Sequence, residues 1–336
     1  MIHFLLRRIL HAGILVLVTL TASFLIIHLA PGDPLTRYYS PDIDPRVMET
    51  VRGQLGLDAP LPVRYAKTLL SFVRGDFGMS LTSYRPVSDV IAEAIPRTIQ
   101  LTGLALLLQM LLGLALGMMS AVRRRRVIDG ALSLVFLFLY SLPSFYLAFA
   151  LIALFSLELG WLPSAGMSSL ALNGSSGFEA WVDRVRHLVL PVSVLALGST
   201  AAFARYARGS VLDVTRQEFV RTARAKGLTE HAVMWKHVFK NALPQLFTVI
   251  GLSIPFLLGG AVVVEKIFAW PGMGTLLVDS IYARDYPVVL AVNLIAAFMV
   301  IIGNLLADLS YYWIDPRIKI PTQEREPGAR GKGNPP

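Results

Sequence analysis

The chain of 336 residues contains no cysteine and few charged side chains. Without cysteine, the protein has no disulfide framework, no thiolate metal site and no cysteine nucleophile. Charged residues make up 16% of the chain and hydrophobic residues 54%, whereas an average soluble domain carries about 25% charged residues. This balance excludes an ordinary soluble globule and predicts a membrane protein.

Residue patterns for metal binding and catalysis are also missing. The six histidines are scattered along the chain, at His3, His11, His28, His187, His231 and His237. They do not form the His-x-x-x-His or His-Glu-x-x-His patterns that hold zinc. The chain also lacks the glycine-rich phosphate-binding loop of ATPases. We therefore expect no catalytic residue, no metal and no cofactor in the chain itself.

Six apolar runs dominate the sequence. A membrane-spanning helix needs about 20 apolar residues, and each run supplies them. The first run is long for the hydrophobic part of a signal peptide and ends in a poor cleavage site, so we interpret it as a span. In the second run, Gly113 and Gly117 have the spacing that lets two helices approach closely. The sequence predicts an all-α membrane protein with six transmembrane helices, at residues 9–30, 98–122, 128–157, 187–208, 244–267 and 287–314.

Polar segments lie between and after these runs. Residues 31–97 contain several prolines, and Asp44-Pro45 and Leu61-Pro62 can each begin a short helix, because proline is tolerated at the first helical position. The tail over residues 321–336 is rich in proline, glycine and charge. We predict that this tail is disordered.

Lysine and arginine predict the orientation of the chain in the membrane. Residues 123–126 are four arginines, and eight basic residues lie between Arg205 and Lys240. The segment 158–186 holds two and the segment 269–286 holds one. Because basic residues favour the cytoplasmic side, this distribution also explains the net charge of +9 without nucleic acid. We predict that residues 1–8, 123–126, 213–240 and 321–336 are cytoplasmic and that 31–97 is periplasmic.

A polar, basic segment from Asp213 to Pro244 separates the fourth and fifth runs. Thr215 and Glu218 fit a capping box, in which the hydroxyl and the carboxylate each accept from the other residue's amide. Val214 and Phe219 fit the hydrophobic staple that often accompanies such a box. These signals predict the start of a short helix.

The same segment predicts a helix, a turn and a second helix. The first helix is expected over residues 216–226 and ends at Gly227, because a left-handed residue at a helix end costs least as glycine. The second helix is expected to have one apolar stripe, formed by Leu228, Ala232, Trp235, Phe239 and Ala242. Such a segment presents one short helix to a soluble partner. An ordinary amphipathic cytoplasmic loop is the alternative interpretation.

The stretch from Glu218 to Gly227 resembles the coupling loop, or EAA loop, of bacterial ABC importer permeases of the peptide and nickel branch. Ala223 and Gly227 match the family pattern, whereas Arg221-Thr222 stand where Glu-Ala would be. Leu243-Pro244 is present, but further from the glycine than in the general pattern. Other blocks that resemble the family follow in the family's order: Leu6–Leu10, Leu29–Pro34, Leu55–Pro60, Gly75–Ser80, Glu265–Gly274 and Ile314–Ile318.

The resemblance implies a type I ABC importer permease fold in the bacterial inner membrane, with residues 98–320 as the permease core. It implies a complex with a second permease, two cytoplasmic ATPases that carry ATP and Mg²⁺, and an extracytoplasmic solute-binding protein. The residues implied to couple to an ATPase are Thr215, Glu218, Phe219, Arg221, Ala223, Lys226, Gly227 and Leu228. The solute stays open among dipeptides, longer peptides, nickel chelates, glutathione and antimicrobial peptides.

Few ionisable residues lie within the apolar runs. Glu265 and Lys266 close the fifth run, and we expect Lys266 to reach the membrane interface. Asn304 and Asp308, late in the sixth run, are candidates for a polar pathway or for hydrogen bonds between helices. A secondary carrier or channel not driven by ATP is the alternative function. It would need relays of intramembrane charges, and these are sparse here.

Overall fold

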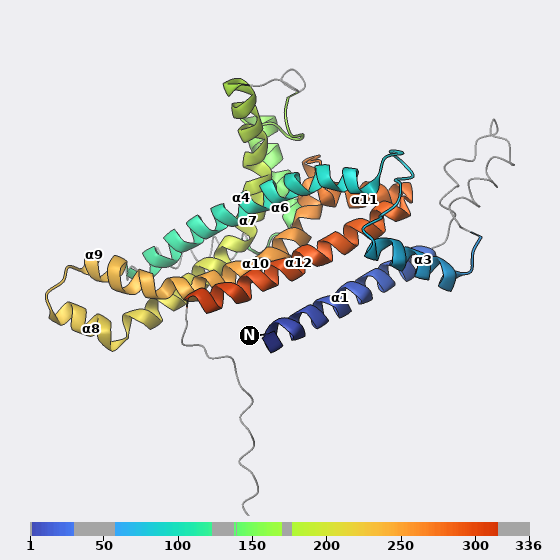
Figure 1. Ribbon diagram of the computed structural model, residues 1–336. Helices are drawn as coiled ribbons and strands as arrows, with labels where there is room; N and C mark the ends of the chain where they lie inside the picture. The colour runs from blue at the N-terminus through green and yellow to red at the C-terminus, as the bar shows by residue number, and fades with distance from the viewer. Residues whose placement is uncertain (1, 30–57, 123–137, 139, 170–176, 315–336) are drawn as a thin grey trace, which may run out of the picture.

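The computed structural model describes residues 2–29, 58–122, 138, 140–169 and 177–314, and these fold almost entirely into helices (Figure 1). Within those ranges the strand-like pairing is one isolated antiparallel bridge, between Met79 and Pro86. The predicted all-α fold is therefore confirmed. Four helices in the described ranges are long and apolar enough to cross a membrane: α1 (Ile2–Leu29), α4 (Val87–Val122), α7 (Phe178–Thr215) and α12 (Tyr286–Ile314).

The other two apolar runs are helical over most of the residues that the structure describes, with a break at Leu142 and Pro143 in the third run. The helix α10 (Lys240–Ile267) covers the fifth run. In the third run, α6 (Ser144–Leu151) begins directly after Pro143 and continues as the π-helix η2 (Ile152–Glu158). Outside the described residues lie the start of the third run, the helix predicted at Asp44-Pro45, the arginines at 123–126 and the tail at 321–336.

Two of the long helices extend beyond the runs that predict them. The helix α4 begins at Val87 rather than at residue 98, and α7 extends over Phe178–Thr215 rather than 187–208. A helix satisfies its backbone hydrogen bonds internally, so it can continue from an apolar stretch into polar sequence. Hydropathy therefore marks the apolar part of each helix and not its ends.

The helix predicted at Leu61-Pro62 is present as α3 (Leu61–Val73). It packs beside the end of α1, where the hydroxyls of Tyr65 and Thr21 are hydrogen-bonded at 2.7 Å. An apolar cluster joins α1, α3 and α12, and it contains Leu20, Phe24, Tyr65, Leu69, Phe72 and Leu290. This cluster holds α3 against one end of the helix bundle.

The predicted close approach at Gly113 and Gly117 is confirmed where α4 packs along α7. A Cβ atom at position 113 would lie 2.6 Å from Cδ1 of Phe203. A Cβ atom at position 117 would lie 2.8 Å from the carbonyl oxygen of Ala204. Both distances are shorter than a van der Waals contact, so a larger residue at either position would force the two helices apart.

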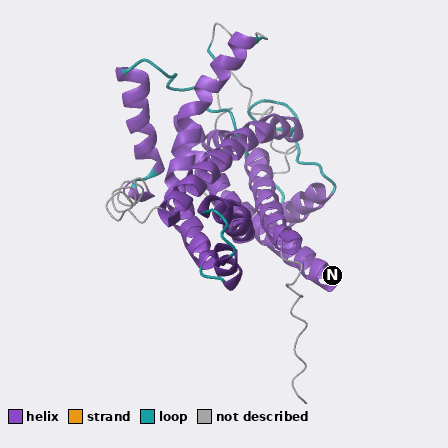
Figure 2. Cartoon of the chain, turned by 90° about the vertical axis from the view of Figure 1, so that its left-hand side faces the viewer, coloured by secondary structure: helices purple, strands orange, loops and turns teal. Residues whose placement is uncertain are grey.

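The two ends of the molecule carry different elements. The short helices α8 (Glu218–Ala225) and α9 (Glu230–Ala232) lie at one end, and α3 and α11 (Met273–Ala283) lie at the other (Figure 1). Figure 2 views the molecule from the α8 end. The helix α1 packs against α12, and the two run in opposite directions (Figure 1). We call the end with α3 and α11 the distal end.

A buried carboxylate explains why the segment 269–286, which lies between the fifth and sixth predicted spans, contains the helix α11. Glu265 of α10 is 0% exposed, and its Oε2 accepts from the backbone amides of Gly274 at 2.7 Å and Thr275 at 3.1 Å. The Thr98 hydroxyl donates to Oε1 of Glu265 at 2.6 Å and accepts from the Met273 amide at 2.7 Å. Side chains of α10 and α4 thus cap the first turn of α11.

Lys266, next in the sequence, points the other way. Its side chain is 45% exposed and pairs with Asp279 of α11, as expected for a lysine that reaches toward the surface. The Trp270 indole, which is almost fully buried, donates to the Arg97 carbonyl oxygen at 3.0 Å. The stretch from Glu265 to Gly274 therefore holds α4, α10 and α11 together.

Candidate functional site

The segment between α7 and α8 does not start as the capping pattern predicts. Thr215 is the last residue of α7, and its hydroxyl donates to the Leu212 carbonyl oxygen at 2.7 Å. Gln217 is the N-cap of α8, with φ −75° and ψ 150° and no side-chain cap. The predicted capping box is wrong because α7 continues through Thr215, whose backbone is helical rather than extended. Glu218 instead pairs with Arg221 at 2.8 Å.

The predicted hydrophobic staple is also wrong. Val214 is 2% exposed and belongs to a core cluster, whereas Phe219 is 38% exposed. The two side chains lie on different sides of the chain because α8 begins at Glu218, two residues later than predicted. Phe219 is therefore available on the surface.

The end of α8 confirms the prediction for Gly227. Its φ is +77°, in the left-handed region that favours glycine. The Gly227 amide donates to the Arg224 carbonyl oxygen at 2.9 Å, and the Leu228 amide donates to that of Ala223 at 3.4 Å. These two bonds are the Schellman motif, which satisfies the last carbonyl groups of a helix.

The inner face of α8 rests on the protein itself. Val220 is 0% exposed and Ala223 is 4% exposed. The apolar cluster around them, which we call the α8 support, consists of Val211, Val214, Val220, Ala223, Val233, Met234, Val238 and Ala242. Sequence reasoning expected Ala223 to contact an ATPase. The structure corrects this expectation, because Ala223 is covered by residues of its own chain.

The apolar stripe predicted for the second helix is confirmed only in part: Ala242 is buried in the α8 support, but Leu228 and Trp235 are exposed. After α9, the chain forms the π-helix η4 (Val233–Phe239), whose wider turns shift the buried face. Val233, Met234 and Val238 are buried, whereas Leu228 and Trp235 are 42% and 51% exposed. A prediction that assumes the 3.6-residue period of an α-helix therefore does not identify this buried face. Trp235 is thus a surface residue that sequence reasoning placed on the buried side.

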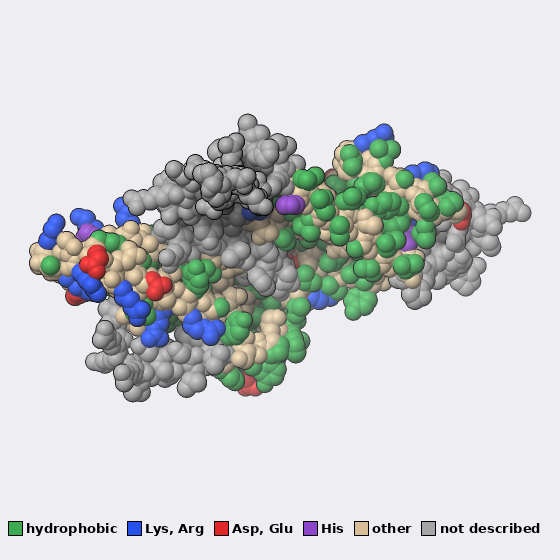
Figure 3. Space-filling view, turned by 90° about the horizontal axis from the view of Figure 1, so that it is seen from below, with side chains coloured by type: hydrophobic (Ala, Val, Ile, Leu, Met, Phe, Trp, Pro, Cys, Tyr) green, Lys and Arg blue, Asp and Glu red, His purple; other side chains and the backbone are tan. Residues whose placement is uncertain are grey.

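The outward face of the α8 region combines apolar and basic side chains. Two short elements are held together by Arg224, whose guanidinium contacts the Glu230 carboxylate at 2.8 and 3.3 Å. Figure 3 shows lysine and arginine side chains gathered at this end of the molecule. The exposed residues of the outward face include Phe219, Arg221, Thr222, Lys226, Leu228 and Trp235. An exposed surface that combines aromatic and apolar side chains with basic ones, supported by a packed apolar cluster, is suited to binding another protein.

Of the two polar candidates in α12, the structure describes the side chain of Asn304 but not that of Asp308. Asn304 lines a pocket of about 280 Å³ between α1 and α12, together with Arg8 and His11. The side chain of Asp308 lies outside the described part of the structure.

Comparison with known families covers almost the whole chain. The family model "Binding-protein-dependent transport system inner membrane component" matches residues 113–320, and the N-terminal model of the same system matches residues 1–102. The chain belongs to this family. It is a permease subunit of an ATP-driven ABC importer and a multi-pass protein of the inner membrane, and its family is one of permeases rather than enzymes.

Curated relatives and solved structures agree with this assignment. The oligopeptide transport system permease protein AppB of Bacillus subtilis is 40% identical over 320 residues, covering 95% of this chain and 100% of the relative. The glutathione transport system permease protein GsiC of Escherichia coli K12 is 39% identical over 319 residues, covering 95% and 99%. An inward-facing MetNI methionine ABC transporter structure matches with a TM-score of 0.53 and 17% identity, covering 67% of this chain and 96% of that chain. The permease thus has the type I ABC importer fold and works in a complex with ATPase and binding-protein components.

Proposed function

We propose that this permease imports peptides and receives the movement of its ATPases through α8. The observation that carries the proposal is the two-sided character of α8. Val220 and Ala223 are buried in the α8 support, while Phe219, Arg221 and Lys226 are exposed. A helix fixed on one side and open on the other can bind a partner and pass its displacement to the membrane helices.

The contacts of the α8 support indicate where that displacement goes. Val211 and Val214 belong to α7, and Ala242 belongs to α10. Because well-packed side chains resist compression, α8 cannot shift without moving the adjoining ends of both helices. ATP and Mg²⁺ bind to the partner ATPases, and closure of the ATPase pair pushes on α8. The pump gains direction because its conformations differ in affinity for nucleotide and for the loaded binding protein.

The charge distribution supports one orientation. The α8 end, which carries the exposed basic residues, faces the cytoplasm together with both chain termini. The distal end and the segment 31–97 face the periplasm and receive the binding protein. A second permease of similar size completes the pathway between the membrane helices, and two ATPases complete the complex.

Peptides are the proposed solute class because the relatives are named for oligopeptide and glutathione transport. Both solutes contain amide bonds and terminal carboxylates. The test is uptake into vesicles that contain this permease with its partner permease, ATPases and binding protein. ATP-dependent uptake of labelled di- or oligopeptides or of glutathione is expected. Uptake of nickel chelates without any peptide uptake would contradict the solute class.

Cross-linking tests the role of α8 separately. The natural chain has no cysteine, so one introduced cysteine is unique. Phe219→Cys on α8 is expected to cross-link to an ATPase subunit in the assembled complex. Tyr282→Cys is the matched control, because Tyr282 is 82% exposed on α11 at the distal end. If neither variant, or both equally, cross-links to the ATPase, the proposed contact is wrong.

A further inference from the structure

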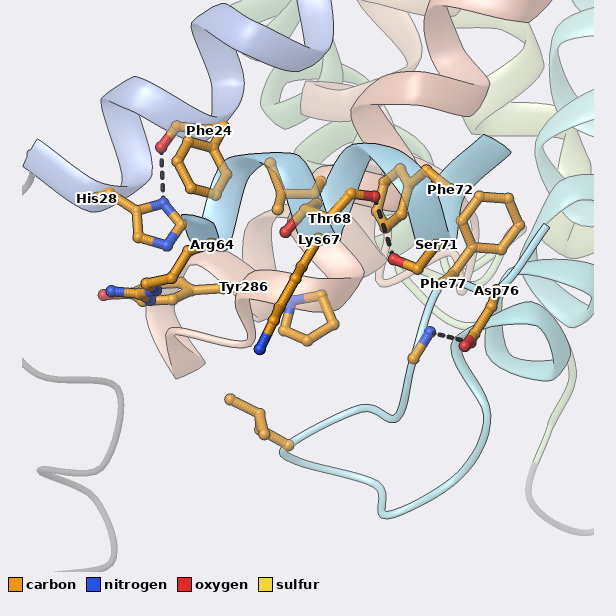
Figure 4. Close-up of a pocket in the computed structure, with 14 residues that line it drawn as sticks. Phe24, His28, Arg64, Lys67, Thr68, Ser71, Phe72, Asp76, Phe77 and Tyr286 are labelled. Carbon is orange, nitrogen blue, oxygen red and sulfur yellow. Dashed lines mark hydrogen bonds between the residues drawn. The ribbon is translucent and has the colours of Figure 1, made fainter. Parts of the chain in front are cut away.

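A second pocket lies at the distal end, away from the α8 region. It has a volume of about 230 Å³ and is enclosed by the end of α1, one side of α3, the loop after α3 and the start of α12 (Figure 4). Its polar lining consists of His28, Arg64, Lys67, Thr68, Ser71, Asp76 and Tyr286. The proposed coupling mechanism uses none of these residues.

Two cations line this pocket from the same helix. Arg64 and Lys67 are three residues apart in α3, so they lie on one face of the helix. Figure 4 shows both side chains on the side of α3 that faces the pocket. Asp76 is the acidic residue of the lining, and its carboxylate already accepts from the Gly78 amide at 2.9 Å. The lining therefore favours a ligand with negative charge.

An aromatic wall stands beside the cations. The rings of His28 and Tyr286 have centroids 5.8 Å apart, and Phe24 stacks on His28 at 3.9 Å. The Phe24 carbonyl oxygen accepts from Nδ1 of His28 at 2.8 Å, which fixes the orientation of that ring. Three separate elements thus shape the pocket before any ligand binds.

Apolar surface borders the pocket on the sides of both α1 and α3. Figure 3 shows hydrophobic side chains across much of the face at this end of the molecule. The exposed apolar residues in the last turns of α1 and in α3 are Leu25, Ile26, Leu29, Leu61, Val63, Leu70 and Val73. In a multi-pass membrane protein, such a border between apolar surface and cations lies at the level of the lipid headgroups.

We propose that this pocket binds the phosphate headgroup of an anionic phospholipid. The phosphodiester lies between Arg64 and Lys67, and the acyl chains lie along the exposed apolar residues of α1. Anionic rather than zwitterionic lipid is expected, because two cations face one carboxylate that is already hydrogen-bonded. The bound lipid would bridge α1, α3 and α12. The proposal does not depend on which end of the permease faces the cytoplasm.

The test measures lipid retained by the full chain, purified with its partner subunits and transferred from vesicles of mixed phosphatidylglycerol and phosphatidylcholine into detergent. Native mass spectrometry is expected to show phosphatidylglycerol retained in preference to phosphatidylcholine. Lys67→Gln is expected to weaken retention roughly fivefold, because each basic residue near a lipid surface contributes about that factor. Arg64→Lys keeps the charge and should retain most of the lipid.

The matched control is Arg74→Gln, since Arg74 is exposed at the end of α3 and does not line the pocket. It removes the same charge and should leave retention unchanged. Equal retention of the two lipids, or equal loss in the Lys67 and Arg74 variants, would overturn the proposal. Displacement of the lipid by inorganic phosphate alone would assign the pocket to a soluble anion. Displacement by the binding protein would assign it to a protein carboxylate. Either result would overturn the lipid assignment.

Discussion

The Thr98 hydroxyl donates to the Glu265 carboxylate at 2.6 Å, between α4 and α10, and both side chains also bind the first turn of α11. A buried carboxylate normally needs a cation or several donors. Here three donors are supplied, one from Thr98 and two from the amides of Gly274 and Thr275. The pair fixes α11 to the bundle at the distal end.

Glu265→Ala is expected to destabilise the permease strongly. It leaves the Gly274 and Thr275 amides without this acceptor, at a cost of about 1–3 kcal/mol for each donor that stays buried. Thermal unfolding in detergent measures the effect. Asp279→Asn is the control, because the pair of Asp279 with Lys266 is exposed and contributes about 0–1 kcal/mol. Equal losses in the two variants would contradict the capping role of Glu265.

Gly117→Val is expected to disrupt the packing of α4 against α7. The added side chain would meet the Ala204 carbonyl oxygen, which lies 2.8 Å from the position of a Cβ atom. Overpacking of this kind costs about 1–3 kcal/mol. Gly103→Val in the same helix is the matched control, because nothing lies within 4 Å of its Cβ position. Unfolding temperatures of the two variants are the measurement, and a similar decrease in both would rule out the packing explanation.

Ala223→Asp and Phe219→Ala should impair transport in different ways. Ala223 is 4% exposed, so an unpaired carboxylate there would separate α8 from its support. We expect this variant to lose transport and to retain the ATPases poorly. Phe219 is exposed, so its truncation should leave thermal stability unchanged and weaken only the ATPase contact. Wild-type transport and full ATPase retention in both variants would show that α8 is not the coupling element.

The left-handed backbone at Gly227 predicts that different substitutions at this position impair coupling to different degrees. Gly227→Ala would strain the turn by about 1–2 kcal/mol, because φ is +77° there. Gly227→Asn should lose less, since asparagine tolerates this conformation better than most residues. ATPase activity coupled to transport is expected to decrease in the order Gly, Asn, Ala. A similar loss with asparagine and alanine would indicate that the absence of a side chain matters, and not the left-handed φ.

Labelling with an impermeant thiol reagent checks the orientation. Thr82 and Lys226 are both exposed, at opposite ends of the molecule. In cells with a permeable outer membrane and an intact inner membrane, Thr82→Cys should react and Lys226→Cys should not. Lysed cells that express the permease without its ATPases should allow both to react, which shows that each site is accessible in principle. The reverse pattern in intact cells would invert the proposed topology.

Features that depend on local sequence could be predicted. The apolar runs identify the long helices, the pair Gly113 and Gly117 identifies a close contact, and Gly227 identifies a helix end. Each depends on a preference that acts within a few residues, such as the tolerance of glycine for positive φ. These preferences are visible in a single sequence.

Features set by distant contacts or by irregular helix geometry could not be predicted. The capping box predicted at Thr215 is not formed, because α7 extends through this residue. The predicted stripe misplaces Trp235, because η4 is a π-helix. The capping of α11 requires Thr98, which lies 167 residues from Glu265 in the sequence. No periodicity in the segment 269–286 reports a cap supplied from another helix.

The continuity of α7 has a mechanical consequence. Its 38 residues form one continuous helix with a total rise of about 57 Å along its axis, whereas the hydrocarbon layer is about 30 Å thick. No loop interrupts the helix between Val214, which belongs to the α8 support, and Pro191, the proline inside the helix. Proline removes one backbone hydrogen bond and so provides a natural pivot. In the proposed coupling, a push on α8 would therefore reach Pro191 through one continuous helix, with no loop in between.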